Sequence, residues 1–322
     1  MLKCPRRNRK SPAIRSLVRE TVLRSEDLVA PFFVIDGVDR KEPIEKMPGI
    51  FRFSVDRLIE EVKYLYKQGL QAILLFSSLP KHMRSELAEE AFNEMGAVPR
   101  AIREIRKEVP GICIMSDIAL DPFTSHGHDG VVIDGDVDNE KTIELLVQMS
   151  LLHAKCGVDY VAPSDMMDGR VLRIRQALDA NGFLRTGILS YCAKYNSSLY
   201  APFRDALNSS FPFLDKRTYQ MDPANVREAI REARLDEEEG ADILMVKPAL
   251  LYLDVIRAMK EVTPLPICAF HISGEYSMVM AAHERGFLDA DKVFLESLLS
   301  IKRAGADFII TYAASRLLPL LA

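Results

Sequence analysis

The chain has 322 residues, of which 48% are hydrophobic and 27% charged, and this balance excludes a disordered tail and a fibrous repeat. Its formal net charge of −4 gives no overall electrostatic reason to bind nucleic acid or an anionic membrane, so a metabolic enzyme is favoured. Charges interrupt every apolar run before it reaches the roughly 18 to 20 residues that a bilayer span needs. The five cysteines are scattered singly, without a CxxC pair, which indicates reduced thiols in the cytoplasm.

Residues 1–27 precede the first predicted strand and are expected to form an N-terminal arm outside the folded core. The start of this arm is basic, with Lys3, Arg6, Arg7, Arg9 and Lys10. No apolar segment of a secretory signal follows, so we interpret the arm as part of the mature protein. The alternative is an Arg-rich organelle transit peptide.

Four segments of the chain share one pattern, in which a charged amphipathic stretch ends at a glycine and a short apolar run follows. The glycines are Gly69, Gly157, Gly240 and Gly305. A glycine at this position can adopt the left-handed conformation that ends a helix. Apolar runs without polar alternation are typical of parallel strands that are covered on both faces.

Eight strands of this kind are predicted, which makes a closed (β/α)8 TIM barrel over 28–322 the expected fold. They lie near 28–35, 72–76, 112–118, 159–163, 187–193, 242–247, 266–272 and 308–312. Helices are expected between them, for example over 55–68, 139–155, 225–239 and 291–304, with Ser54, Asp138, Asp222 and Asp289 as N-caps. The alternative is an open doubly wound sheet, but no GxGxxG or GxxxxGKS loop accompanies it.

The connection over about 195–222 is long and lacks a helical period. In a barrel it follows the fifth strand at the C-terminal face, where active sites lie, so we interpret it as a lid over a substrate. The alternative is a flexible surface insertion. Arg204, Lys216 and Arg217 in this segment could grip a substrate carboxylate. The other interpretation is that they pair with Asp205 and Asp215 on the surface.

Reactive side chains gather at the expected ends of the strands, and two of them are lysines on adjacent strands. The set is Ser77, Asp117, Ser164, Asp165, Lys194, Lys247, Ser273 and Tyr312. Burial and a second ammonium group both lower the pKa of a lysine, and the neutral amine attacks a ketone to form a Schiff base. A keto acid substrate is therefore predicted. The alternative is that Lys194 and Lys247 only pair with carboxylates such as Asp117 or Asp165.

The segment SDIALDPFTSHGHDG, at 116–130, is dense in Asp and His. Asp121 and Asp129 would favour a hard cation such as magnesium over zinc, whereas His126 and His128 are too close together for the usual helical metal-binding pair. The alternative is a turn-rich loop whose polar side chains bond its own backbone.

The chain resembles the delta-aminolevulinic acid dehydratase family, also called porphobilinogen synthases, along nearly its whole length. The motifs that carry the resemblance are SPAIRSLVRET, ALDPFTSHGHDG, DYVAPSDMMDGRV, SYCAKYNSSLYAPFRDA, DKRTYQMDPAN, ADILMVKPA, HISGEYSM and ITYAA. The resemblance implies condensation of two 5-aminolevulinate molecules into porphobilinogen, in tetrapyrrole and heme synthesis, without an organic cofactor. It also implies a homo-octamer in which the arm embraces a neighbouring subunit, located in the cytoplasm.

The resemblance further implies a role for each residue that matches the family motifs. Lys247 corresponds to the lysine that forms the Schiff base with the P-side substrate, and Lys194 to its A-side partner. Asp117, Ser164 and Asp165 would hold and deprotonate the substrate amino group. Ser273 and Tyr312 would bind the P-side carboxylate, and Arg204, Lys216 and Gln220 the A-side carboxylate.

The resemblance also bears on metals. Where zinc-dependent members have three cysteines, this chain has Ala119, Asp121 and Asp129, so an active-site zinc is not expected and magnesium, potassium or no tightly held ion takes its place. An allosteric magnesium is implied, with Glu232 as the protein ligand and Asp168 supporting its water shell. The competing functions are a one-lysine Schiff-base barrel, such as an aldolase or transaldolase, and a non-catalytic scaffold.

Overall fold

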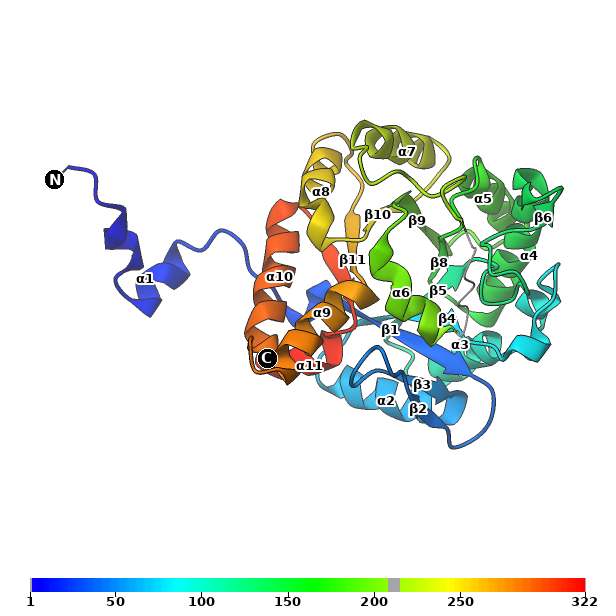
Figure 1. Cartoon of the computed structure of the whole chain (residues 1–322), viewed down its shortest axis with the longest axis horizontal. Helices are drawn as coiled ribbons and strands as arrows, with labels where there is room; N and C mark the ends of the chain where they lie inside the picture. The colour runs from blue at the N-terminus through cyan, green and yellow to red at the C-terminus, as the bar shows by residue number, and fades with distance from the viewer. Residues whose placement is uncertain (1, 208–214, 322) are drawn as a thin grey trace.

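The computed structural model describes residues 2–207 and 215–321, apart from the side chain of Asp205; part of the predicted lid therefore lies outside the described residues. Eight parallel strands form a closed barrel, because the last pairs with the first. They are β1 (Leu28–Ile35), β4 (Ala72–Ser77), β5 (Cys113–Ile118), β8 (Tyr160–Pro163), β9 (Gly187–Lys194), β10 (Ile243–Lys247), β11 (Ile267–His271) and β12 (Phe308–Thr311). The predicted (β/α)8 barrel is confirmed (Figure 1).

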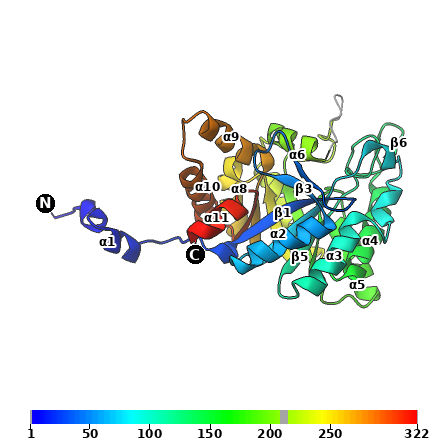
Figure 2. The same ribbon diagram turned by 90° about the horizontal axis from the view of Figure 1, so that it is seen from below.

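Helices surround the barrel. They are α2 (Val55–Lys67), α3 (Ala97–Glu108), α4 (Asn139–Cys156), α5 (Arg170–Ala180), α6 (Ala201–Ala206), α7 (Arg227–Glu238), α8 (Leu253–Lys260), α9 (Ser273–Glu284), α10 (Ala290–Ala304) and α11 (Ala314–Leu321). The four predicted helix-ending glycines all have positive φ, from 99° to 131°. Figure 2 shows α6 and α9 at the same end of the barrel.

The structure corrects two of the four predicted N-caps. Asp138 and Asp289 accept backbone N–H groups at the starts of α4 and α10, as expected. Ser54 occupies the cap position of α2 but bonds the backbone of Arg40 instead. Asp222 is not a cap, because α7 begins only at Arg227 and the Asp222 carboxylate accepts the N–H of Ala224 within the preceding turn.

Four short strands were not predicted. A hairpin of β2 (Lys41–Pro43) and β3 (Phe51–Ser54) adds to the barrel sheet beside β1, and β6 (Val132–Ile133) pairs with β7 (Asp136–Val137). Their two to four residues are too few for a strand-period signal.

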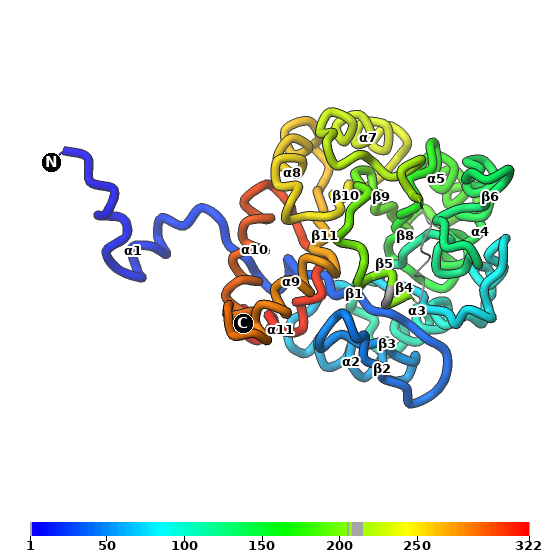
Figure 3. The backbone as a smooth tube through the Cα atoms, in the orientation of Figure 1, coloured from blue at the N-terminus to red at the C-terminus, as the bar shows by residue number. Residues whose placement is uncertain are grey.

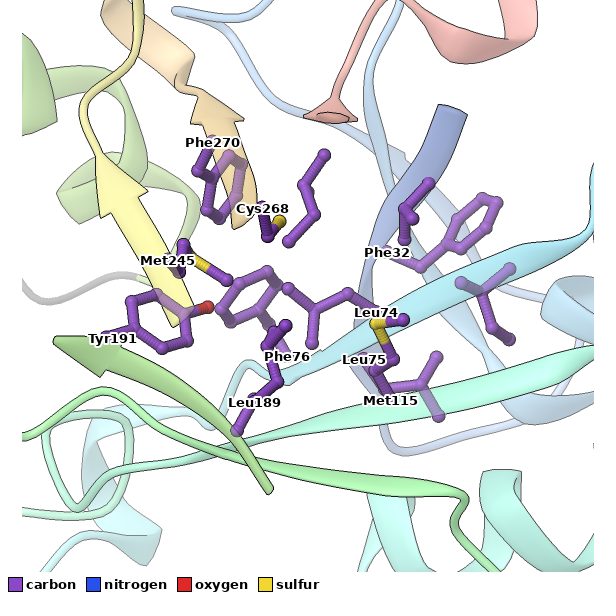
Figure 4. Close-up of a cluster of buried hydrophobic side chains, with 14 of the residues drawn as sticks. Phe32, Leu74, Leu75, Phe76, Met115, Leu189, Tyr191, Met245, Cys268 and Phe270 are labelled. Carbon is purple, nitrogen blue, oxygen red and sulfur yellow. The ribbon is translucent and has the colours of Figure 1, made fainter. Parts of the chain in front are cut away.

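Close-packed apolar side chains fill the inside of the barrel, so it is a core and not a pore. Figure 4 shows Phe76, Leu189, Met245 and Cys268 meeting there from separate strands. The polar cavity described below lies above this layer, at the C-terminal ends of the strands.

The residues before β1 extend away from the barrel (Figures 1 and 3). They contain two short 3-10 helices, Pro5–Arg9 and Ser25–Asp27, and α1 (Pro12–Leu17). Leu17, Val18 and Val22 are exposed on this arm. Among the described residues, no helix is both long and apolar enough to cross a membrane.

Candidate active site

Lys194 and Lys247 are direct neighbours in the barrel wall, because they are register partners at the ends of β9 and β10. The register shifts by one residue between the Ser190–Leu244 and Ala193–Val246 pairs, so β9 contains a bulge. Side chains of a regular strand alternate between its two faces, and one extra residue inverts that alternation. Lys194 is therefore turned to the same inner side as Lys247.

Lys247 lies in an aromatic box. Its Nζ is 4.7–6.0 Å from the ring centroids of five aromatic residues, which are Phe76, Tyr191, Tyr200, Phe203 and Phe270. The side chain is buried, and burial together with the nearby Lys194 ammonium lowers the pKa of Lys247 to about 7. A large fraction of this amine is thus uncharged at neutral pH.

Lys194 has the opposite surroundings, since its ammonium is fully paired. Its Nζ donates to the Ser164 carbonyl and to the Asp129 carboxylate, the latter at 3.2 Å. Asp129 also accepts from Lys216 at 2.8 Å and from the Gln220 amide at 3.4 Å. Burial raises the pKa of Asp129, but the two lysines outweigh burial and hold it well below its usual range.

A second carboxyl group faces the lysines from β5. Burial raises the pKa of Asp117 to about 7, although Lys247 and Lys194 oppose this rise. Burial likewise raises the pKa of Asp121, which lies 3.6 Å from the Lys216 ammonium. Lys247 and Asp117, each with a pKa of about 7, are suited to exchanging protons with a bound molecule at neutral pH.

Apart from Asp129, these groups line one cavity at the C-terminal ends of the strands. Its walls are Phe76, Asp117, Asp121, Ser164, Lys194, Tyr200, Phe203, Arg204, Lys216, Gln220 and Lys247. The structure thus brings together both predicted lysines, Asp117 and Ser164 with three predicted residues of the lid. Lys216 pairs with Asp129 and Asp121 inside the site, whereas the exposed Arg217 pairs with Asp215, as the surface-pairing alternative expects.

Four of the eight residues predicted at the strand ends do not line this cavity. Ser77 faces a separate cavity with His153. Asp165 is buried behind the strand end, beside Arg170. Ser273 lies at the start of α9, 3.5 Å from the Leu199 carbonyl, and Tyr312 stacks on Phe33. Residues of the lid segment lie close to both, since Leu199 accepts from the Ser273 hydroxyl and Phe203 packs against Phe33 at 5.7 Å, the ring on which Tyr312 stacks.

The aromatic box was missed by sequence reasoning. Its rings come from β4, β9, β11 and the start of the lid, so their proximity depends on the closed barrel. The only available signal was the aromatic content of the lid segment, where Tyr200 and Phe203 precede Arg204.

A second cavity of about 850 Å³ adjoins the C-terminal part of the lid and holds the predicted magnesium residues. Asp168 and Glu232 both line it, together with Asp136, Asn139 and Glu228. Burial and the nearby Asp236 raise the pKa of Glu232 to about 7. The carboxylate and amide oxygens in its lining fit a hard cation, although the Arg217 guanidinium lines it too. We call this the acidic cavity.

No group of three or more His, Cys, Asp or Glu side chains among the described residues is arranged to hold a metal ion. Any magnesium in the acidic cavity would therefore retain much of its water, which is its usual habit in proteins. Asp129 fits an active-site cation poorly, because two lysines already neutralise it.

A barrel with two adjacent buried amines, one of them with a pKa lowered to about 7, has the arrangement expected of an enzyme of the Schiff-base-forming class. A family model described as delta-aminolevulinic acid dehydratase matches residues 2–320. The chain belongs to this family of lyases.

Individual members agree over almost the whole chain. The delta-aminolevulinic acid dehydratase of Chlamydia pneumoniae is 50% identical over 317 residues, covering 98% of this chain and 96% of that protein. The Methanothermobacter thermautotrophicus protein of the same name is 50% identical over 315 residues, covering 97% and 95%. A crystal structure of the Toxoplasma gondii enzyme in complex with its product porphobilinogen has a TM-score of 0.97 and 46% identity, covering 99% of this chain and 92% of that one.

Proposed function

We propose that the chain condenses two 5-aminolevulinate molecules into porphobilinogen, with Lys247 and Lys194 each forming a Schiff base with one substrate. The observation that carries this proposal is the register pairing of the two lysines, one in an aromatic box and the other on a carboxylate. A reaction between two ketones needs two activated carbonyls side by side. Fixing both on neighbouring strands replaces a bimolecular encounter by an intramolecular step.

Lys247 acts first, because its amine is already partly uncharged. The amine adds to the ketone of the P-side substrate, and loss of water leaves the imine. Ser273 and Tyr312 bind the carboxylate of this substrate once Leu199 and Phe203 withdraw from above them. Asp117, with its pKa near 7, exchanges a proton with the substrate amino group beside Ser164.

Lys194 must lose a proton before it can form the second imine. Arg204, Lys216 and Gln220 bind the carboxylate of the A-side substrate. When Lys216 turns to that carboxylate, Asp129 is left with Lys194 as its main partner and can accept its proton. The two imine formations release the two water molecules of the reaction. C–C and C–N bond formation between the two substrates then displaces both lysine amines, and loss of a ring C–H proton gives the pyrrole.

The test combines product detection with trapping. The protein is incubated with 5-aminolevulinate, porphobilinogen is measured colorimetrically, and borohydride reduction with peptide mapping locates the adducts. We expect product and adducts at Lys247 and Lys194, with none at the exposed Lys67. An adduct at one lysine without porphobilinogen supports an aldolase-type reaction, and the absence of both product and adducts contradicts the proposal.

For the acidic cavity we propose a magnesium ion held by Glu232, with Asp168 bonding its water shell. For the assembly we propose a homo-octamer joined by the arms, located in the cytoplasm. The oxygen donors of the cavity and the exposed apolar residues of the arm support these proposals. Sedimentation with and without a chelator is the test. Magnesium should favour the larger species, and an unchanged distribution contradicts its role.

A further inference from the structure

Arg170 is a buried arginine that none of the roles above uses. It begins α5, has 2% of its surface exposed, and lies between α5, α7 and the outer side of β9. Burying a guanidinium is costly unless its hydrogen bonds and charge are satisfied. The partners of Arg170 therefore indicate what it stabilises.

One set of partners lies in β9, at the bulge. The Arg170 Nη2 donates to the Ser190 hydroxyl at 3.2 Å and to the Tyr191 carbonyl at 3.4 Å. A bulge interrupts the hydrogen-bond ladder, so backbone groups there need other partners. Arg170 supplies such a partner at the irregularity that turns Lys194 inward.

The second partner, Asp165, is adjacent in the chain to the residue whose carbonyl accepts from Lys194. The Asp165 carboxylate lies 3.7 Å from Arg170 Nε and accepts the Met167 N–H at 2.7 Å. Asp165 directly follows Ser164, whose carbonyl accepts from the Lys194 ammonium. Arg170 thus contacts both the strand that carries Lys194 and the segment to which Lys194 bonds.

The third partner, Asp236, connects Arg170 to α7, the helix that carries Glu232 of the acidic cavity. Arg170 donates twice to Asp236 of α7, at 3.4 and 3.2 Å, and Asp236 also accepts from Ser190. Asp236 lies one helical turn beyond Glu232, which lines the acidic cavity. The Met167 carbonyl, on the wall of the same cavity, accepts from Arg170 at 3.2 Å.

We propose that Arg170 is a positioning residue for Lys194. From behind the barrel wall it stabilises the bulge in β9 and anchors the Ser164 segment, so that the Lys194 amine stays beside Lys247. The proposal rests on the proposed function only in taking Lys194 as the second imine-forming lysine. No hydrogen bond or ion pair joins Lys247 to Arg170, Asp165 or Asp236. Lys247 is linked to this network only indirectly, through the Tyr191 ring and Lys194, so it should be affected less than Lys194.

The test uses Arg170→Met and Arg170→Lys, the second of which keeps the charge if the first does not fold. Asp236→Asn removes the α7 side of the network without touching the cavity of the lysines. Arg175→Met is the matched control, since Arg175 lies on the same helix but pairs with Asp179 and the Thr186 carbonyl.

We expect kcat to fall about 10- to 100-fold in the Arg170 variants with little change in KM, as displacements near 1 Å cause. Borohydride trapping should fall at Lys194 and persist at Lys247, and crystal structures should show the bond from Lys194 to the Ser164 carbonyl broken. Asp236→Asn should act in the same direction, and Arg175→Met should match the wild type.

Equal loss of trapping at both lysines would show a general structural role and overturn the proposal. An unchanged position of the Lys194 side chain in the variant structures would overturn it as well. Absence of adducts in the wild-type protein contradicts the proposed function instead, and the position of Lys194 in the crystal structures still decides the role of Arg170.

Discussion

Lys194 and Lys247 are register partners with opposite electrostatic surroundings. The Lys194 ammonium binds Asp129 and the Ser164 carbonyl, whereas among the described residues no carboxylate forms an ion pair with Lys247. Because the paired ammonium lies beside the aromatic box, it helps to keep the second amine uncharged. In the proposed mechanism this asymmetry makes Lys247 the first nucleophile and Lys194 the second.

The first prediction concerns the pH dependence of Lys247. A pKa of about 7 means that the amine is mostly protonated at pH 6 and mostly free at pH 8, so its rate of labelling by an amine-directed reagent should rise roughly tenfold between them. Lys194→Met removes a cation that lowers this pKa, so the midpoint should move to higher pH. Mass spectrometry measures both, with the exposed Lys67 as reference; a midpoint that does not move argues against electrostatic coupling.

The second prediction distinguishes a reaction that needs both lysines from a reaction that needs only one of them. Arginine keeps the positive charge but cannot form an imine, so Lys247→Arg and Lys194→Arg should each lower kcat by about three orders of magnitude. Porphobilinogen formation is the assay, and circular dichroism checks the fold. Full activity of either variant would exclude a Schiff-base role for that lysine.

The third prediction concerns Asp129, which neutralises two buried lysines. Asp129→Asn leaves Lys194 and Lys216 without their shared counter-ion, so the free energy of unfolding should fall by about 3–5 kcal/mol. Urea denaturation measures it. Asp215→Asn is the control, because its ion pair with Arg217 is exposed and its loss should leave the urea midpoint unchanged. Equal effects of the two substitutions would contradict this account.

The fourth prediction concerns the close approach of α9 to the lid. A Cβ on Gly274 would lie 2.3 Å from the Leu199 carbonyl oxygen, so Gly274→Ala must displace the lid segment or the start of α9 at Ser273. We expect a higher KM for 5-aminolevulinate and a loss of about 1–3 kcal/mol of stability. Steady-state kinetics and thermal unfolding test this, with Met278→Ala on the exposed face of α9 as control. An unchanged KM would mean that the contact does not position Ser273.

The fifth prediction concerns the arm. Leu17, Val18 and Val22 are exposed on a segment that extends away from the barrel, and such residues are normally covered by another surface. Deleting residues 2–23 should give a smaller species by sedimentation, with the unfolding transition of the barrel retained. The deletion keeps Asp27 and its 3.0 Å ion pair with Lys302. An unchanged assembly would exclude the arm as its main contact.

The sequence by itself determined the barrel and the identity of its reactive groups. Glycine-ended helices and uninterrupted apolar runs are local signals, and each of the eight barrel strands was predicted from them. The motifs around Lys194 and Lys247 likewise placed both lysines at strand ends. Short-range patterns suffice to locate the strands, because a parallel strand that is buried on both faces consists of consecutive apolar residues.

Only the tertiary structure decided how these groups are arranged. The bulge in β9 turns Lys194 inward, Asp129 takes two lysines as partners, and Asp165 points to Arg170 and not to the cavity. The aromatic box around Lys247 joins rings from four separate parts of the chain. These features depend on register and on contacts between residues far apart in sequence, and a one-residue shift that reverses the facing of a side chain leaves no trace in local composition.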